Sequence, residues 1–220
     1  MSDGCPGLLL VHDAHGVDDW LSDLAQRFVE LGFEVSAPEV LEPEEGGAFA
    51  ADRVVQTQLE SALKELSSRD SVDSERLAVI GFGDGGTHAF LLGCASTELA
   101  AVAIFDSPLV YAELSREQPI QPLEMALNLS APLLAVFSSS PSAVEDAHVD
   151  QLRQVGSQFA KDFDIVTGDG GAEEAYRHLD SKSSSDARAA TIGATSWKRL
   201  ISFLAECLEV PELEANSSGA

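Results

Sequence analysis

Short apolar runs alternate with amphipathic stretches along most of the chain. Each run is continuous and is bounded by turn residues, which is typical of strands that are covered on both faces. The runs are Gly7–His12, Phe33–Pro38, Leu77–Phe82, Ala101–Phe105, Leu133–Ser138 and Phe163–Val166. Because helical patterns separate them, the sequence predicts βαβ units and a parallel sheet.

The stretches between these runs place apolar residues three and four positions apart, as an amphipathic helix requires. This spacing predicts helices over Asp18–Leu31, Ala50–Leu66, a stretch from about Thr87, Val144–Phe159 and Ser196–Leu208. Two polar segments, Glu42–Ala48 and Asp180–Ala190, read as loops, the second with the alternative of an extended helix start. We therefore predict an α/β fold with a mostly parallel sheet of about six or more strands and helices on both faces.

The length and the tail set the expected domain organisation. The chain has 220 residues, 45% of them hydrophobic, and no internal stretch resembles a linker. We expect a single α/β domain over residues 1–209 and a disordered acidic tail over residues 210–220.

The charge of the chain limits its partners. It carries 37 acidic and 13 basic residues, for a formal net charge of −24. Such an excess of negative charge repels nucleic acid and anionic membranes, so we expect neither as a partner. The start of the chain has no basic segment, and Leu8–Val11 is too short for a signal peptide or a membrane span, so we predict a cytoplasmic protein. The sequence leaves the oligomeric state undetermined.

The cysteines offer no framework for a disulfide or a metal. Cys5, Cys94 and Cys207 lie far apart and show no CxxC spacing. We therefore read them as core or surface thiols and predict no bound cofactor.

One turn carries the strongest sign of chemistry. The strand residues Leu77–Ile80 run into the turn Gly81-Phe82-Gly83-Asp84-Gly85-Gly86, and a helix follows from about Thr87. A tight strand–turn–helix with small residues around a central position is a nucleophile elbow, in which the central side chain is held at the helix N-terminus. Here the central residue is Gly83, which has no side chain that could attack a substrate.

The segment from Pro6 to Leu41 resembles the opening of the dienelactone hydrolase family, which has the α/β-hydrolase fold. Its turn reads His12-Asp13-Ala14-His15-Gly16 where the family has an H-E-x-x-G-like turn, and Ala37-Pro38-Glu39-Val40 matches the family's A-P-D-L. The elbow resembles the family's G-F-C-F-G-G, and the segment Ala131–Phe137 resembles the approach to a later strand. The likeness covers roughly residues 6–209.

The resemblance implies a Cys or Ser, an Asp and a His as a catalytic triad of an ester or lactone hydrolase. By local motif these positions fall on Gly83, Pro141 and Gly171. No acidic residue occurs from Phe137 to Val144, and no histidine occurs between His148 and His178. A triad works as a unit, so the loss of its members favours a protein that no longer hydrolyses esters through it.

Several polar residues remain near the expected cleft. By position, the backbone N–H groups of Ala14 and Asp84 match the family's oxyanion hole, and Asp13, His15 and His88 lie close to them in sequence. A carboxylate beside that hole would repel a developing oxyanion, which argues against acyl transfer.

Each of these residues also has a purely structural explanation. His12 reads as a structural loop histidine, Asp84 as a favourable charge at a helix N-terminus, and His178 as an exposed helix residue. Weak catalytic candidates are Asp84, His12 and His178.

Three functions stay open on the sequence. The first, which we favour, is a pseudo-hydrolase that binds a small molecule or a protein. The second is an active hydrolase of small esters or lactones with relocated residues. The third is a metal-dependent enzyme built on His12, Asp13, His15 and Asp84, although no spaced metal motif joins these residues.

Overall fold

The computed structural model describes residues 4–40, 51–137, 144–168, 177, 187–210 and 213, with side chains in the last helix described from residue 195. Six strands form one sheet in the order β2-β1-β3-β4-β5-β6, and every neighbouring pair is parallel. The strands are β1 (Cys5–Val11), β2 (Glu34–Ser36), β3 (Val72–Phe82), β4 (Leu99–Phe105), β5 (Leu133–Phe137) and β6 (Phe163–Thr167). Each predicted run became a strand, which confirms the predicted sheet.

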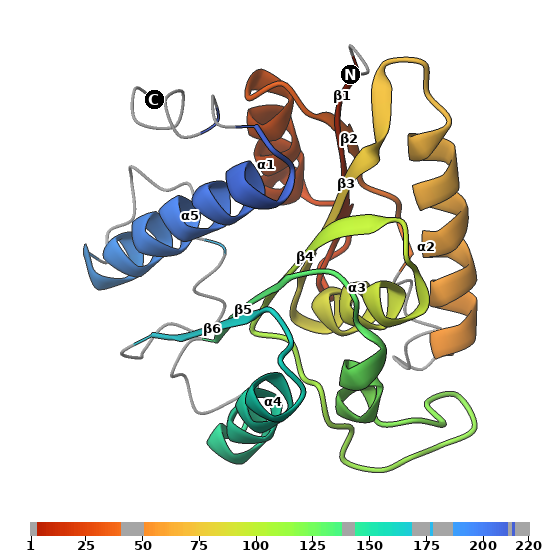
Figure 1. The fold of residues 1–220 in the computed structure, drawn as a ribbon, viewed down its shortest axis with the longest axis vertical. Helices are drawn as coiled ribbons and strands as arrows, with labels where there is room; N and C mark the ends of the chain where they lie inside the picture. The colour runs from red at the N-terminus through yellow and green to blue at the C-terminus, as the bar shows by residue number, and fades with distance from the viewer. Residues whose placement is uncertain are drawn as a thin grey trace.

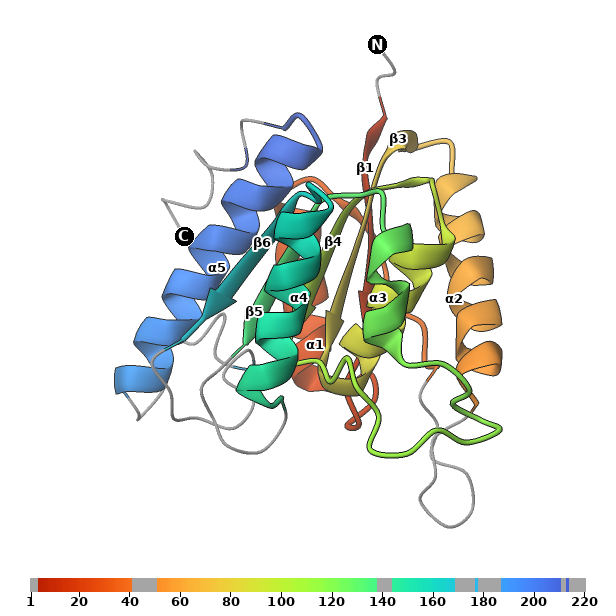
Figure 2. The same ribbon diagram turned by 60° about the horizontal axis from the view of Figure 1, so that its bottom comes forward.

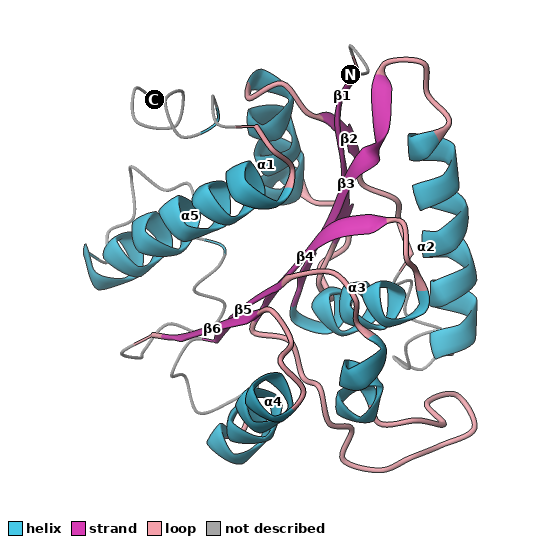
Figure 3. Cartoon of the chain, viewed as in Figure 1, coloured by secondary structure: helices cyan, strands magenta, loops and turns pink. Residues whose placement is uncertain are grey.

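Helices cover both faces of this sheet (Figure 1). On one face lie α2 (Asp52–Ser67), α3 (Gly83–Ala95) and α4 (Asp146–Gln158), together with the short 3₁₀ helix η1 (Pro122–Asn128). On the other face lie α1 (Asp19–Glu30) and α5 (Ala187–Cys207). The cartoon coloured by secondary structure shows the sheet as the middle layer between them (Figure 3).

The core is split by the sheet because successive side chains of a strand point to opposite faces. In β1, Leu9 and Val11 join the cluster under α2 and α3, whereas Leu8 and Leu10 join the cluster under α1 and α5. All four side chains are fully buried. Strands buried on both faces explain why the sequence showed continuous apolar runs rather than alternation.

Three elements differ from the prediction. Helix α3 begins at Gly83, not near Thr87, so the second half of the elbow already belongs to its first turn. Helix α5 begins at Ala187, so the last part of the predicted loop Asp180–Ala190 is helical. The 3₁₀ helix η1 was not predicted, and such short helices carry little periodicity to read.

Some predicted segments lie outside the described residues, among them the loop Glu42–Ala48 and most of the tail. Leu213, within the tail that we expected to be disordered, is buried against the α1–α5 cluster. No helix in the described ranges is long and apolar enough to cross a membrane.

Candidate functional site

The elbow between β3 and α3 lies at the carboxyl edge of the sheet, where open α/β sheets bind ligands (Figure 2). Its central residue, Gly83, has φ of +51°, in the left-handed region that favours glycine. The turn therefore keeps the strained geometry of a nucleophile elbow while its centre presents no side chain.

Glycines on either side of Gly83 are required by close packing. A Cβ on Gly85 would lie 1.9 Å from the carbonyl oxygen of His12, and one on Gly86 would lie 1.8 Å from Ser107 Oγ. A Cβ on Gly81 would lie 2.5 Å from the Cα of Gly86. The first turn of α3 thus sits directly against the residues that follow β1 and β4.

Asp84 follows the centre of the elbow and lies in the first turn of α3. Its carboxylate makes no hydrogen bond or ion pair within the described part of the chain. Burial, and then the negative charge of Asp13, raise the pKa of Asp84. The elbow therefore carries a partly buried carboxyl group that lies close enough to Asp13 to feel its charge.

His12 is buried at the end of β1 and braces the neighbouring loop. Its Nδ1 lies 2.7 Å from the carbonyl oxygen of Asp13. Its Nε2 accepts a hydrogen bond from the backbone N–H of Val40 at 3.0 Å and lies 3.0 Å from Glu39 Oε1. Since both ring nitrogens are in contact with the protein, this geometry is that of the structural loop histidine expected from the sequence.

Asp13 turns into the molecule and binds Arg177. The guanidinium donates to both carboxylate oxygens of Asp13 over 2.9 to 3.1 Å and also donates to Asp18 at 2.8 Å. Arg177 Cζ lies 5.0 Å from the centroid of the Trp20 ring, and Trp20 packs edge-on against Phe82 of the elbow strand. We call Arg177, Asp13, Asp18 and Trp20 the arginine clamp.

The clamp changes the titration of its members. Burial lowers the pKa of Arg177, but the hydrogen bonds and charges of Asp18 and Asp13 outweigh it and raise that pKa. For Asp18, burial is outweighed by the hydrogen bonds from Arg177 and from the Leu21 N–H, so the pKa of Asp18 is lowered. Sequence reasoning missed Arg177, because nothing local marks an arginine that pairs 164 residues away.

The other polar residues at this edge of the sheet make fewer contacts. His15 has an exposed side chain, and its backbone N–H and Nδ1 contact Asp13 Oδ1 at 2.8 and 3.0 Å. Ala14 is exposed in the same turn, after β1. Asp106 follows β4 at the same edge of the sheet and is a buried non-glycine residue with φ of +48°, in a bend of the backbone.

A second polar group lies beside α3, and sequence reasoning found only one of its members. His88 is buried with its Nδ1 3.9 Å from Asp52 Oδ1, and the Tyr111 hydroxyl donates to the same oxygen at 3.0 Å. Gln56 Nε2 donates to the carbonyl oxygen of His88 at 2.9 Å. We call Asp52, Gln56, His88 and Tyr111 the α2–α3 polar cluster. It places His88 against α2 and inside the protein, not at the surface where the sequence predicted it.

The proposed metal site of His12, Asp13, His15 and Asp84 is wrong. Within the described residues, which include all four, no three His, Cys, Asp or Glu side chains are arranged to hold a metal ion. The physical reason is that the protein itself occupies the ligating atoms, since His12 braces Val40 and Asp13 binds Arg177.

The remaining triad positions, Pro141 and Gly171, lie outside the described residues, and so does His178. Of the three positions implied by the resemblance, the structure therefore describes Gly83 alone.

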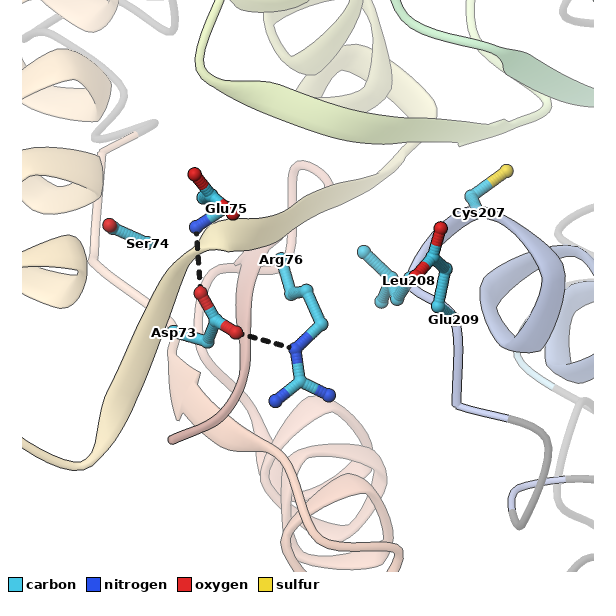
Figure 4. A pocket seen from close by; sticks show the side chains of 7 residues that line it. All are labelled: Asp73, Ser74, Glu75, Arg76, Cys207, Leu208 and Glu209. Carbon is cyan, nitrogen blue, oxygen red and sulfur yellow. Dashed lines mark hydrogen bonds and ion pairs between the residues drawn. The ribbon is translucent and has the colours of Figure 1, made fainter. Parts of the chain in front are cut away.

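A hollow of about 770 Å³ lies at the opposite, amino-terminal edge of the sheet, between the start of β3 and the end of α5 (Figure 4). Asp73 accepts hydrogen bonds there from the Glu75 N–H at 3.1 Å and from Arg76 Nε at 2.9 Å. Burial, and then the charges of Asp162 and Glu206, raise the pKa of the Cys207 thiol to about 11. The thiol is therefore protonated at neutral pH.

The six-stranded parallel sheet with helices on both faces and the elbow after β3 define an α/β-hydrolase fold. Solved structures agree with this class. A "Putative Dienelactone Hydrolase" of Klebsiella pneumoniae is 21% identical, with a TM-score of 0.77 over 93% of this chain and 88% of that one. Pyrococcus horikoshii acylaminoacyl peptidase, at 15% identity, gives a TM-score of 0.73 over 94% of this chain and 38% of that one.

Within this class, the sequence identifies the family of the chain. The sequence model of the dienelactone hydrolase family matches residues 2–208, and the chain belongs to that family. A similar protein is the "Putative carboxymethylenebutenolidase" of Methylorubrum extorquens, 25% identical over 209 residues, which make up 89% of this chain and 70% of the relative.

Proposed function

We propose that this member of the dienelactone hydrolase family is a pseudo-hydrolase, which binds a small molecule in the cleft above Gly83 and does not cleave esters through a covalent intermediate. One observation carries the proposal. The elbow keeps its left-handed backbone at φ of +51°, yet the residue there has no nucleophile. Covalent acyl transfer requires a nucleophile beside a base, and Gly83 supplies no atom that could be acylated.

The charges around the elbow support the same proposal. The backbone N–H groups that would stabilise an oxyanion belong to the turn after β1 and to the start of α3, beside the carboxyl group of Asp84, whereas the carboxylate of Asp13 is paired with Arg177. Negative charge at this place destabilises a developing oxyanion, whereas hydrolases aim donors at it. Burial, and then the charge of Asp13, raise the pKa of Asp84, so a further negative charge is disfavoured at this place.

The geometry gives little support to the alternative, an active hydrolase with a relocated set of catalytic residues. His12, the described histidine among the weak catalytic candidates, contacts Asp13, Glu39 and Val40 through its two ring nitrogens. Used as a general base, it would have to give up the hydrogen bond from Val40, which is buried.

The test is an esterase and lactonase assay with p-nitrophenyl acetate and dihydrocoumarin on the purified full chain. We expect no turnover above the buffer rate. We also expect none from Gly83→Cys or Gly83→Ser, because a nucleophile alone does not rebuild a triad.

Turnover by the unmodified protein that Asp84→Asn or His12→Asn reduces by about 100-fold or more would contradict the proposal and favour the relocated hydrolase. The matched control is Asp23→Asn, which removes the same charge from an exposed position on α1. A loss of turnover in this control as well would point to a general effect of charge.

A further inference from the structure

Strand β6 ends the sheet, and no strand of the described part of the chain pairs with its outer side (Figure 1). On its inner side it pairs in parallel with β5, and the Gly168 N–H that follows it donates to Phe137 of β5. Backbone groups point alternately to the two sides of a strand, so the even-numbered residues of β6 bond to β5. The N–H and C=O groups of Ile165 and the N–H of Thr167 therefore point outward.

A hollow of about 430 Å³ lies along this open edge, between β6 and the second half of α4. Phe163 and Ile165 of β6 are partly buried against the core and remain partly exposed. The residues that line the hollow include Arg153, Gly156 and Ser157 of α4, Phe163 and Ile165 of β6, and Lys161 between the two elements. The outward groups of the strand thus border a space that is open to solvent.

Two cations mark the two ends of this hollow. Arg153 donates to Thr167 Oγ1 at 3.3 Å, at the carboxyl end of β6. Lys161 precedes β6 and donates to the carbonyl oxygen of Leu129 at 2.8 Å. Each cation keeps further donors, because a guanidinium has five N–H groups and an ammonium has three. The strand from Phe163 to Thr167 spans about 13 Å, so a single carboxylate would reach only one of the two cations.

The carboxylates near the hollow are already paired. Asp164 lines it, but its side chain points to the other face of the sheet and accepts a hydrogen bond from Arg199 of α5. Asp150 pairs with Arg153 at 3.0 Å, and this ion pair is weak because the Asp150 side chain is 73% exposed. A ligand in the hollow therefore meets positive charge, although the whole chain has a formal net charge of −24.

We propose that the outer edge of β6 binds an extended peptide segment of a partner protein, with two acidic side chains four residues apart and an apolar side chain midway between them. The peptide adds a strand and exchanges backbone hydrogen bonds with Ile165 and Thr167. Side chains i, i+2 and i+4 of a strand share one face and span about 13 Å, so the acidic residues meet Arg153 and Lys161. The apolar residue packs beside Ile165. No residue of the elbow takes part, so this inference goes beyond the proposed function and does not depend on it.

The experiment titrates the ¹⁵N-labelled full chain with the peptide Ac-Thr-Glu-Thr-Val-Thr-Glu-Thr-NH2 and follows the amide signals by NMR. We expect saturable shifts of the Ile165 and Thr167 amide signals and slower hydrogen exchange of both amides. Two matched peptides separate the contributions of charge and backbone. One has Lys in place of each Glu, and the other carries N-methyl groups on its three central residues. Each should bind at least about tenfold more weakly, because it loses either the ion pairs or the backbone hydrogen bonds.

Three outcomes would overturn the proposal. The first is equal binding of the Lys peptide, or no shift of the two amide signals up to millimolar concentrations of the acidic peptide. The second is displacement of the peptide by an equal concentration of glutarate, which would make the hollow a site for small anions. The third is protection of the Ile165 and Thr167 amides in the free chain that grows with protein concentration, which would place a second copy on this edge.

Single substitutions test the location. Arg153→Gln and Lys161→Gln each remove one cation and should weaken peptide binding by about two- to fivefold. Lys64→Gln removes the same charge from an exposed position on α2 and should leave binding unchanged. Ile165→Pro removes the outward N–H and spares the bonds to β5, as edge strands tolerate, and should abolish binding. Equal weakening by Lys64→Gln would refute the site, and Arg153→Gln keeps the test usable if Ile165→Pro fails to fold.

Discussion

Arg177 binds both carboxylate oxygens of Asp13 through contacts of 2.9 to 3.1 Å, although 164 residues separate the two. Asp13 follows β1 beside the elbow, so the pair ties a late segment of the chain to the carboxyl edge of the sheet. The Asp13 side chain is 5% exposed, which makes it a buried charge that depends on its partner.

Removal of that partner should therefore be costly. We expect Arg177→Met to lower the free energy of unfolding by about 3 kcal/mol, because it removes the guanidinium that binds both oxygens of the buried Asp13 carboxylate. Urea denaturation measures the change. The double variant Asp13→Asn with Arg177→Met should recover part of the loss. Arg153→Met breaks an exposed pair with Asp150 and should cost about 1 kcal/mol or less. Equal losses of unfolding free energy for Arg177→Met and Arg153→Met would show that the arginine clamp contributes no more stability than an exposed ion pair.

The elbow glycines should differ sharply in their tolerance of a methyl group. Gly85→Ala would place a Cβ 1.9 Å from the His12 carbonyl oxygen, so we expect that variant to lose more than about 4 kcal/mol or to fail to fold. Gly83→Ala should cost about 1–2 kcal/mol through its left-handed backbone. Gly32→Ala is the matched control, since Gly32 has φ of +96° and no atom within 4 Å of the added Cβ. Thermal or urea unfolding ranks the three, and a mild Gly85→Ala would mean that α3 does not pack against β1 as described.

His88 should make stability depend on pH. Its pKa is about 4 in the folded protein and 6.5 ordinarily, so between these values the unfolded chain binds a proton that the folded one does not. Stability contributed by the neutral imidazole is therefore present above pH 6.5 and is lost as the pH falls toward 4, by about 3 kcal/mol.

The measurement compares the unfolding free energy of the protein with that of His88→Gln across this range. The raised pKa values of Asp52 and Asp84 act in the opposite direction, but the comparison cancels them to first order. His148→Gln, which changes a partly exposed histidine on α4, should keep the pH profile of the parent. A parallel profile for His88→Gln would show that His88 is not held neutral.

His12 should act on stability and not on chemistry. His12→Leu leaves the backbone N–H of Val40 and the carbonyl oxygen of Asp13 without their ring partner in a buried place, and we expect a loss of about 3 kcal/mol. His15→Leu, whose side chain is 52% exposed, should change stability by about 0.5 kcal/mol or less. Thermal unfolding separates the two, and similar values would remove the structural role assigned to His12.

The features that the sequence predicted correctly are those recorded in local patterns of residues. The six strands, the elbow and the absence of a side chain at Gly83 follow from short stretches, in which periodicity and glycine spacing record the local backbone. The family resemblance rested on the same stretches, and the family match over residues 2–208 agrees with it. His12 and Asp84 were also recognised, because they adjoin strand ends that the sequence had already located.

The tertiary structure decided which distant side chains meet. The contacts of Asp13 with Arg177 and of His88 with Asp52 and Tyr111 join segments that share no local signal. Whether a carboxylate is paired, a histidine neutral or a metal site impossible depends on burial and on partners from other elements, and these appear only when the helices pack on the sheet. The sequence therefore determined that the elbow has no nucleophile at Gly83, and the packing of helices on the sheet determined which side chains surround that position.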